Sequence, residues 1–178
     1  MSKTSMLAAT SLALLAAGCA APQQKSGLAV PETLKPGATE SLAIVAPAKG
    51  VQIYECRSSK HPAGSYEWAF VAPEADLMDA NGKKIGRHYA GPVWESADGS
   101  KVQGAVQARA DAPAANAIPW LLLAAKSVGP EGSFSKVTRI QRLNTSGGIA
   151  PKTGCSQAAV GTAARVSYSA DYYFFSAR

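Results

Sequence analysis

The side chains best suited to chemistry in this chain lie between positions 88 and 98. Acids, bases and aromatic rings are concentrated there, as His88, Tyr89, Trp94, Glu95 and Asp98. Glycoside hydrolysis uses two carboxyl groups on either side of the bond that breaks, and a sugar ring stacks well on an indole. One interpretation is therefore a hydrolase site, with His88, Glu95 and Asp98 as candidate acid–base groups and Trp94 as the platform.

The same residues also have a binding interpretation and a structural one. A binding site would hold a ligand with Tyr89 and Trp94 and would need no proton transfer. In the structural interpretation, Asp98 starts a turn and Trp94 belongs to the core. Glu95 then faces solvent beside Arg87. Spacing along the chain does not choose between these readings, because acid–base catalysis depends on separation in space.

Metal and cofactor chemistry have no motif to support them. The spacings typical of zinc sites, such as His-x-His, His-Glu-x-x-His and Cys-x-x-Cys, do not occur in the sequence. A Ser-His-Asp hydrolase built on His88 and Asp171 would lack the Gly-x-Ser-x-Gly turn that presents such a serine. The dinucleotide-binding pattern Gly-x-Gly-x-x-Gly is also missing. We therefore expect no metal and no cofactor.

Asp171 is a further binding candidate, because it lies in the middle of a predicted strand between aromatic residues. Two environments fit it. It either faces solvent or is the buried partner of Arg142 or Arg165, which would be mainly a structural role.

The first eighteen residues have the three parts of a bacterial secretory signal: a basic head, an apolar stretch and small residues before a cut site. The apolar stretch of about a dozen residues is too short to span a bilayer as a stable helix. Cys19 after Gly18 is typical of a lipobox, in which the cysteine is lipidated, although Ala16 stands where lipoproteins usually have Leu. Cleavage after Ala20 or Ala21 by the ordinary signal peptidase is the alternative.

The residue that follows Cys19 is Ala20 rather than Asp. In lipoproteins this generally directs the protein to the outer membrane. We therefore expect an outer-membrane lipoprotein that faces the periplasm or the exterior, with a soluble periplasmic or secreted protein as the alternative.

Size and charge bound the remaining architecture. Removal of residues 1–18 leaves 160 residues, the size of one domain. Residues 19–40, rich in Pro, Gln and Ala, predict a lipidated N-terminus and a flexible tether, so the globular β-domain spans residues 41–178. The full chain has a formal net charge of +6. Its basic residues are scattered rather than interleaved with aromatics, which predicts no nucleic-acid partner.

Cys56 and Cys155 are the only cysteines after Cys19. Two thiols in an oxidising compartment most simply form a disulfide. The alternatives, a pair of metal ligands or a reactive thiol, lack a nearby His or a Cys-x-x-Cys spacing.

From residue 42 onward, apolar residues recur mostly at every second position between frequent turn signals, which indicates strands. The clearest alternations place Val102, Gly104, Val106 and Ala108 on one face, and later Val166, Tyr168, Ala170, Tyr172 and Phe174. Residues 119–126 suit either a buried strand or a short helix. We predict an all-β fold, a single antiparallel β-sandwich or barrel of about eight to ten strands, with long loops and little helix beyond the signal peptide.

Several sequence blocks also resemble a known family. They are GVQIYEC at 50–56, APEADL at 72–77, GRHYAGPVWE at 86–95, IPWLLL at 118–123 and YSADY at 168–172. Over residues 45–175 the chain resembles the family catalogued as domain of unknown function 3455. The resemblance implies an exported bacterial or fungal protein without an agreed activity. Some relatives carry a dehydrogenase label, which the missing dinucleotide-binding pattern does not support.

Two functions remain in view. The leading hypothesis is a non-enzymatic β-domain, attached to the membrane through a lipid anchor, that binds a small molecule, a glycan or an envelope protein. The alternative is a secreted hydrolase that acts on envelope or extracellular carbohydrate.

Overall fold

The structure, a computed structural model, describes residues 29–60 and 62–178. Its strands are β1 (Glu40–Ser58), β2 (Tyr66–Met78), β3 (Lys84–Tyr89), β4 (Val93–Ser96), β5 (Lys101–Ala110), β6 (Trp120–Ser127), β7 (Val137–Gly147) and β8 (Ala163–Ala177). Two short 3₁₀ turns, η1 (Glu32–Leu34) and η2 (Gln157–Ala159), are the helical elements of this part of the chain. The predicted signal peptide and Cys19 lie outside the described residues.

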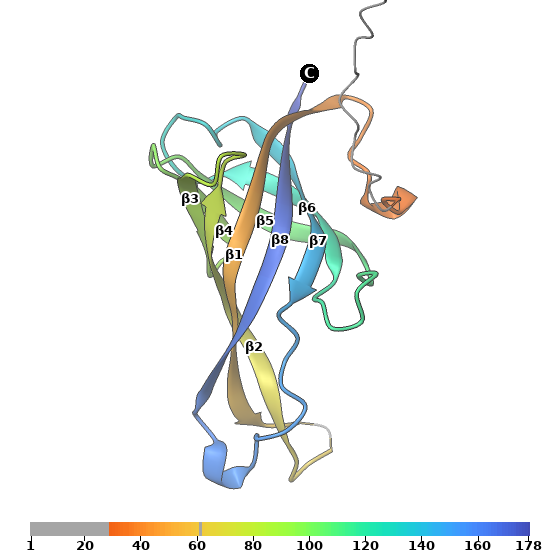
Figure 1. The fold of residues 1–178 in the computed structure, drawn as a ribbon, viewed down its shortest axis with the longest axis vertical. Helices are drawn as coiled ribbons and strands as arrows, with labels where there is room; N and C mark the ends of the chain where they lie inside the picture. The colour runs from red at the N-terminus through yellow and green to blue at the C-terminus, as the bar shows by residue number, and fades with distance from the viewer. Residues whose placement is uncertain (1–28, 61) are drawn as a thin grey trace, which may run out of the picture.

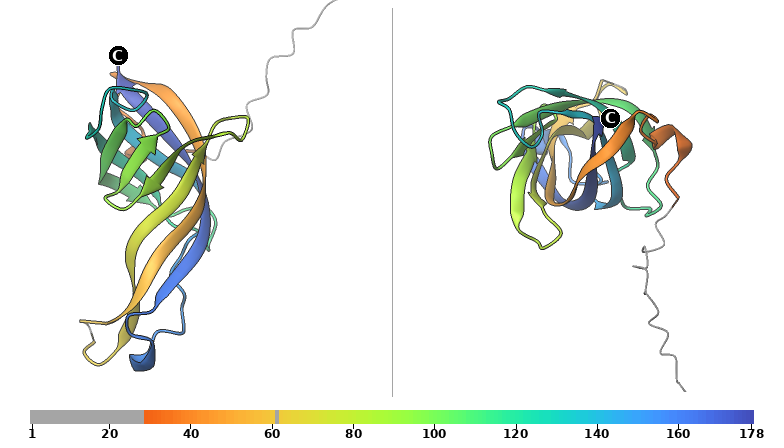
Figure 2. Two further views of the ribbon diagram at one scale, coloured as in Figure 1. Left: turned by 90° about the vertical axis from the view of Figure 1, so that its left-hand side faces the viewer. Right: turned by 90° about the horizontal axis from the view of Figure 1, so that it is seen from above.

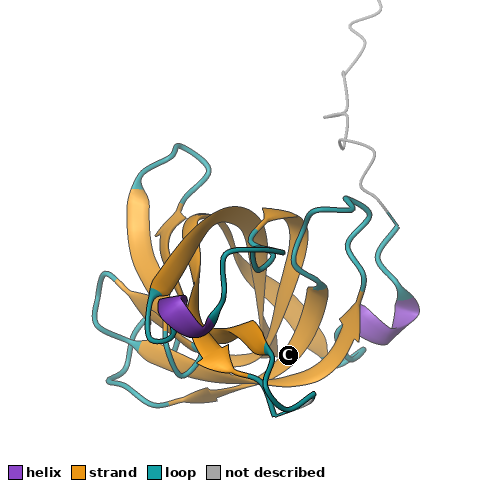
Figure 3. Cartoon of the chain, turned by 90° about the horizontal axis from the view of Figure 1, so that it is seen from below, coloured by secondary structure: helices purple, strands orange, loops and turns teal. Residues whose placement is uncertain are grey.

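The strands form one closed antiparallel barrel in which each pairs with its neighbours in the sequence and β8 returns to β1. Figure 1 shows the strands from the side, and Figure 3 shows the ring in a view along the barrel. The predicted all-β class is confirmed, and of the two architectures the barrel is the one observed. Residues 120–127 form β6, which settles the ambiguous segment as a strand. Among the described residues, no helix has the length and hydropathy that a membrane crossing requires.

Three strands run well past the barrel. β1, β2 and β8 continue beyond one end as a long twisted sheet, whereas the C-terminus lies at the opposite end (Figures 1 and 2). The segment between β7 and β8 is attached to this extension. A disulfide joins Cys56 to Cys155 with a Cα–Cα distance of 5.3 Å, as predicted, and the Trp68 indole donates to the Thr153 carbonyl.

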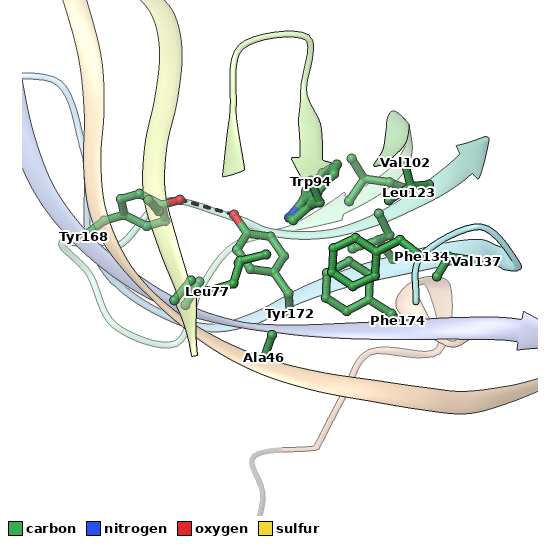
Figure 4. Packing of buried hydrophobic residues seen from close by; sticks show 14 of the residues in the cluster. Ala46, Leu77, Trp94, Val102, Leu123, Phe134, Val137, Tyr168, Tyr172 and Phe174 are labelled. Carbon is green, nitrogen blue, oxygen red and sulfur yellow. Dashed lines mark hydrogen bonds between the residues drawn. The ribbon is translucent and has the colours of Figure 1, made fainter. Parts of the chain in front are cut away.

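Along each strand, side chains point alternately inward and outward, and the inward-facing ones fill the barrel interior. On β8 the predicted pattern is confirmed, because Tyr168, Ala170, Tyr172 and Phe174 are all buried. Near one end, the ring of Phe134 stacks on Phe174 with centroids 4.7 Å apart, as Figure 4 shows. Burial of such large aromatic side chains supplies much of the driving force for folding.

A bulge in β5 changes which residues face inward. Val102 and Gly104 point into the barrel, but the register shifts between Val106 and Ala108. The predicted placement of Ala108 on the same face as Val102 is therefore wrong. Ala108 packs in a cluster on the outside of the barrel, and Arg109 turns inward instead. A bulge adds one residue to a strand, which inverts the alternation beyond it.

The outside cluster is covered by residues that the sequence assigns to the tether. Leu34 is fully buried against Trp120, Leu122 and Leu143. The side-chain amide of Gln141 also donates to the Leu34 carbonyl. The packed part of the structure thus begins upstream of residue 41.

Candidate functional site

A cavity of about 400 Å³ lies between the aromatic core of the barrel and the extension of β1 and β2. Sites for small organic ligands commonly measure about 300–1,000 Å³. The residues that line it come from all eight strands and the loops beside them: Gln52, Tyr54, Phe70, His88, Pro92, Trp94, Val106, Arg109, Ile118, Pro119, Leu121, Leu123, Arg142 and Tyr172.

Most of the cavity wall is apolar. Leu121, Leu123 and Ile118 form part of it, and all three pack in the interior cluster. Phe70 and Val106 remain 54% and 58% exposed although they line the same cavity. Exposed apolar side chains beside a cavity are a feature of ligand-binding grooves.

Arg142 is the principal charged group within the cavity. It lies two residues after the buried Ile140 on β7, so both face inward. Its Nε and Nη2 donate to the Pro119 carbonyl at 3.1 and 2.9 Å. All twelve acidic residues of the sequence are among the residues that the structure describes, yet none forms an ion pair with Arg142.

The hydroxyls of Tyr54, Tyr168 and Tyr172 lie close enough to this guanidinium to be influenced by its charge. Tyr54 donates to the Gly148 carbonyl at 2.6 Å, and the Tyr168 and Tyr172 oxygens are 3.3 Å apart, joined by the dashed line in Figure 4. Burial raises the pKa values of Tyr54 and Tyr172, and the positive charge of Arg142 acts in the opposite direction. The raised pKa values keep both phenols neutral at physiological pH.

His88 forms the deepest polar part of the wall and is only 3% exposed. Its ring stacks on Trp94 with centroids 4.1 Å apart, and the edge of Tyr172 meets it at 5.2 Å. The Nδ1 atom is 2.9 Å from the Val93 carbonyl. Because a carbonyl oxygen only accepts, Nδ1 carries the proton and Nε2 keeps its lone pair.

Desolvation lowers the pKa of His88 from 6.5 to about 3, with the charge of Arg142 adding to the effect and the Val93 hydrogen bond opposing it. An imidazole with so low a pKa is a weak base. His88 is thus suited to accept a hydrogen bond in the cavity and poorly suited to take up a proton at neutral pH.

Trp94 belongs both to the core of the barrel and to the wall of the cavity. It is 1% exposed, which confirms the structural interpretation of this residue, and it also lines the cavity. A Cβ at Gly104 would lie 2.8 Å from the Trp94 ring, so glycine allows the indole to lie flat against β5. The indole Nε1 is buried without a hydrogen-bond partner. In Figure 4 this nitrogen is on the side of the ring toward the Tyr172 hydroxyl.

Glu95 and Tyr89 lie on the outside of the β3–β4 hairpin. The Glu95 carboxylate accepts from the Tyr89 hydroxyl at 2.8 Å and from Arg87 at 2.9 Å, so the predicted neighbourhood of Glu95 and Arg87 is confirmed. The hydrogen bond from Tyr89, together with that from Arg87, lowers the pKa of Glu95. Neither Glu95 nor Tyr89 lines the cavity.

Asp98 joins the turn between β4 and β5 to the loop that contains Ser133. One carboxylate oxygen accepts from the backbone and hydroxyl of Ser100, and the other from those of Ser133. These hydrogen bonds hold the pKa of Asp98 well below its usual range. Ser100 in turn accepts from the backbone of Phe134, which places the Phe134 ring in the core. Asp98 and Glu95 have no common partner in the structure.

Asp171 faces outward from β8. Its carboxylate accepts from the Asn144 side chain at 2.9 Å. Of the two environments that the sequence left open, a buried partnership with Arg142 or Arg165 is not formed, and Arg165 pairs with Glu74. The alternative, a residue on the solvent face, is the one observed.

The structure therefore brings two of the sequence candidates, His88 and Trp94, to one cavity. It adds residues that were not among the sequence candidates for the site, chiefly Arg142, Tyr54 and Phe70. A signal for Arg142 was present, because it follows Ile140 by two positions and shares its strand face. Within the described residues, no group of three or more His, Cys, Asp or Glu side chains is placed to hold a metal ion.

Fold and site together define an up-and-down β-barrel with an open, largely apolar cavity that contains a half-buried arginine. The chain belongs to the family described as Protein of unknown function (DUF3455), whose model matches residues 36–176. No curated protein and no solved structure matches the chain.

Proposed function

We propose that this protein is an exported, non-enzymatic binding protein that holds a small, largely apolar molecule inside its barrel. The observation that carries the proposal is the cavity of about 400 Å³, whose wall is mainly apolar and whose rim exposes Phe70 and Val106. A preformed apolar cavity with a few convergent polar groups is the usual form of a small-molecule site.

The arrangement of acid and base groups favours binding over hydrolysis. His88 is the one sequence candidate for acid–base chemistry that lines the cavity, and its pKa of about 3 makes it a weak base. Glu95 and Asp98 are engaged elsewhere by other side chains. A retaining or inverting glycosidase needs both carboxyl groups at the substrate.

Binding can be tested with Nile red, a neutral dye that fluoresces in apolar surroundings. We expect the exported protein to bind it saturably, and Val106→Trp to weaken binding at least about tenfold by filling the opening. Val45→Trp is the matched control, because Val45 is an exposed residue of β1 that does not line the cavity. Absence of saturable binding, or equal affinity in the Val106 variant, would contradict the proposal.

We further propose that the protein is attached to the outer membrane by lipid on Cys19. The support is the signal sequence and the Gly18-Cys19 pair. With labelled palmitate supplied to cells, the wild-type protein is expected to carry the label and the Cys19→Ala variant to carry none. An unlabelled wild-type protein would contradict lipidation and leave the soluble periplasmic or secreted alternative.

A further inference from the structure

The charge of the cavity is unbalanced. Two arginines, Arg109 and Arg142, line it, and no aspartate or glutamate does. Arg142 is half-buried, and none of the chain's twelve acidic residues, all within the described part, pairs with it. A cation removed from bulk water without a counter-charge is unfavourable. An anionic ligand would remove this cost.

The hydrogen-bonding groups near Arg142 match an anion as well. A guanidinium has five N–H donors, and two of its nitrogens, Nε and Nη2, are engaged by the Pro119 carbonyl, which leaves further N–H groups for a ligand. The Trp94 Nε1 donates only, and it is buried without a partner. The Tyr172 hydroxyl lies beside both residues. A carboxylate, which only accepts, fits such a set of donors.

The apolar wall determines the rest of the ligand. Phe70, Leu121 and Val106 line the same cavity as Arg142, and two of them are exposed at its rim. A molecule whose head group meets Arg142 would place its body against these side chains. Arg109 is exposed in the same lining and would attract anions from solution.

We infer that the ligand class of this cavity is an organic carboxylic acid with an apolar body, whose carboxylate pairs with Arg142 and accepts from Trp94. The inference rests on the proposed function, because it specifies the occupant of the same cavity. It excludes neutral lipids and sugars as the preferred ligands.

Displacement of Nile red by a matched pair of compounds tests the head group. Phenylbutyrate and phenylbutanol have the same apolar body and differ in the carboxylate. We expect phenylbutyrate to compete at least about tenfold more strongly with the wild-type protein. Arg142→Met should abolish this preference, Arg142→Lys should keep part of it, and Arg139→Met, a change on the outer face of β7, should leave it intact.

Each outcome is decisive. If the two compounds compete equally for the wild-type protein, the carboxylate inference is overturned, and this comparison needs no variant. Saturable binding of Nile red would in that case still support the proposed function. A preference that survives both Arg142 substitutions overturns the assignment of Arg142. If Arg142→Met fails to fold, Arg142→Lys and the wild-type comparison still decide. Lack of Nile red binding overturns the proposed function itself.

Discussion

Acidification from pH 7 to pH 4 is expected to lower the free energy of unfolding by about 3 kcal/mol through His88 alone. The folded-state pKa of His88 is about 3, against an ordinary value of 6.5. Between these values the unfolded chain binds a proton that the folded protein does not bind. Stability therefore rises with pH across this window and is lost as the pH falls from about 6.5 toward 3.

Urea unfolding at several pH values between 7 and 4 measures this effect. His88→Gln keeps a side-chain N–H for the Val93 carbonyl but does not titrate, so the dependence on pH should become much flatter. The readout is the slope of the free energy of unfolding against pH, so the stability of the variant at neutral pH does not affect the comparison. Asp98 interferes little, because its ordinary pKa of 3.8 lies below this range. Parallel curves for the two proteins would show that His88 is not buried in its neutral form.

The second large effect concerns the disulfide between Cys56 and Cys155, which are 99 residues apart. A cross-link that closes a loop of about 100 residues restricts the unfolded chain by about 4.7 kcal/mol in the chain-entropy model. The Cys56→Ala, Cys155→Ala double variant should lose most of that stability. The segment between β7 and β8 should also loosen, because the disulfide is its covalent link to β1 and the hydrogen bond from Trp68 on β2 to the Thr153 carbonyl is much weaker than a covalent bond.

Two measurements check this prediction. Urea midpoints should fall in the double variant and in wild-type protein reduced with dithiothreitol, and these two should agree. Trypsin should cut after the exposed Lys152 faster in both than in the oxidised protein. Unchanged midpoints, or two reactive thiols in denatured but unreduced wild-type protein, would contradict the role assigned to the bridge.

The pattern of the sequence predicts the strands better than it predicts how they close. On β8 the alternation from Tyr168 to Phe174 identifies the inward face correctly. Alternation is required by sandwiches and barrels alike, so it does not distinguish them. The distinction lies in the pairing of β1 with β8, the first and last strands of the barrel. The bulge near Val106 has no signature in the apolar pattern, and it misplaces Ala108.

The candidate site could be predicted only in part from the sequence, for a related reason. Composition drew attention to His88 and Trp94, which do line the cavity. Asp98 was correctly read as a turn residue, but its bond to Ser133 crosses 35 positions and is invisible to local reasoning. Arg142 can be recognised as a site residue only once its strand face is known to border the cavity.

The return of β8 to β1 also governs how the molecule can reach its native state. β1 pairs with β8 from Glu40 to Glu55, and the backbone N–H of Arg178 donates to Thr39 at 2.9 Å. The ring is thus closed by the contacts most distant in sequence, and such topologies fold slowly because loop closure precedes the gain from pairing. A chain that ends before β8 would present the open edges of β1 and β7, which recruit strands of other molecules. Folding of this barrel consequently depends on the last fifteen-residue strand, and partial chains are the species prone to aggregate.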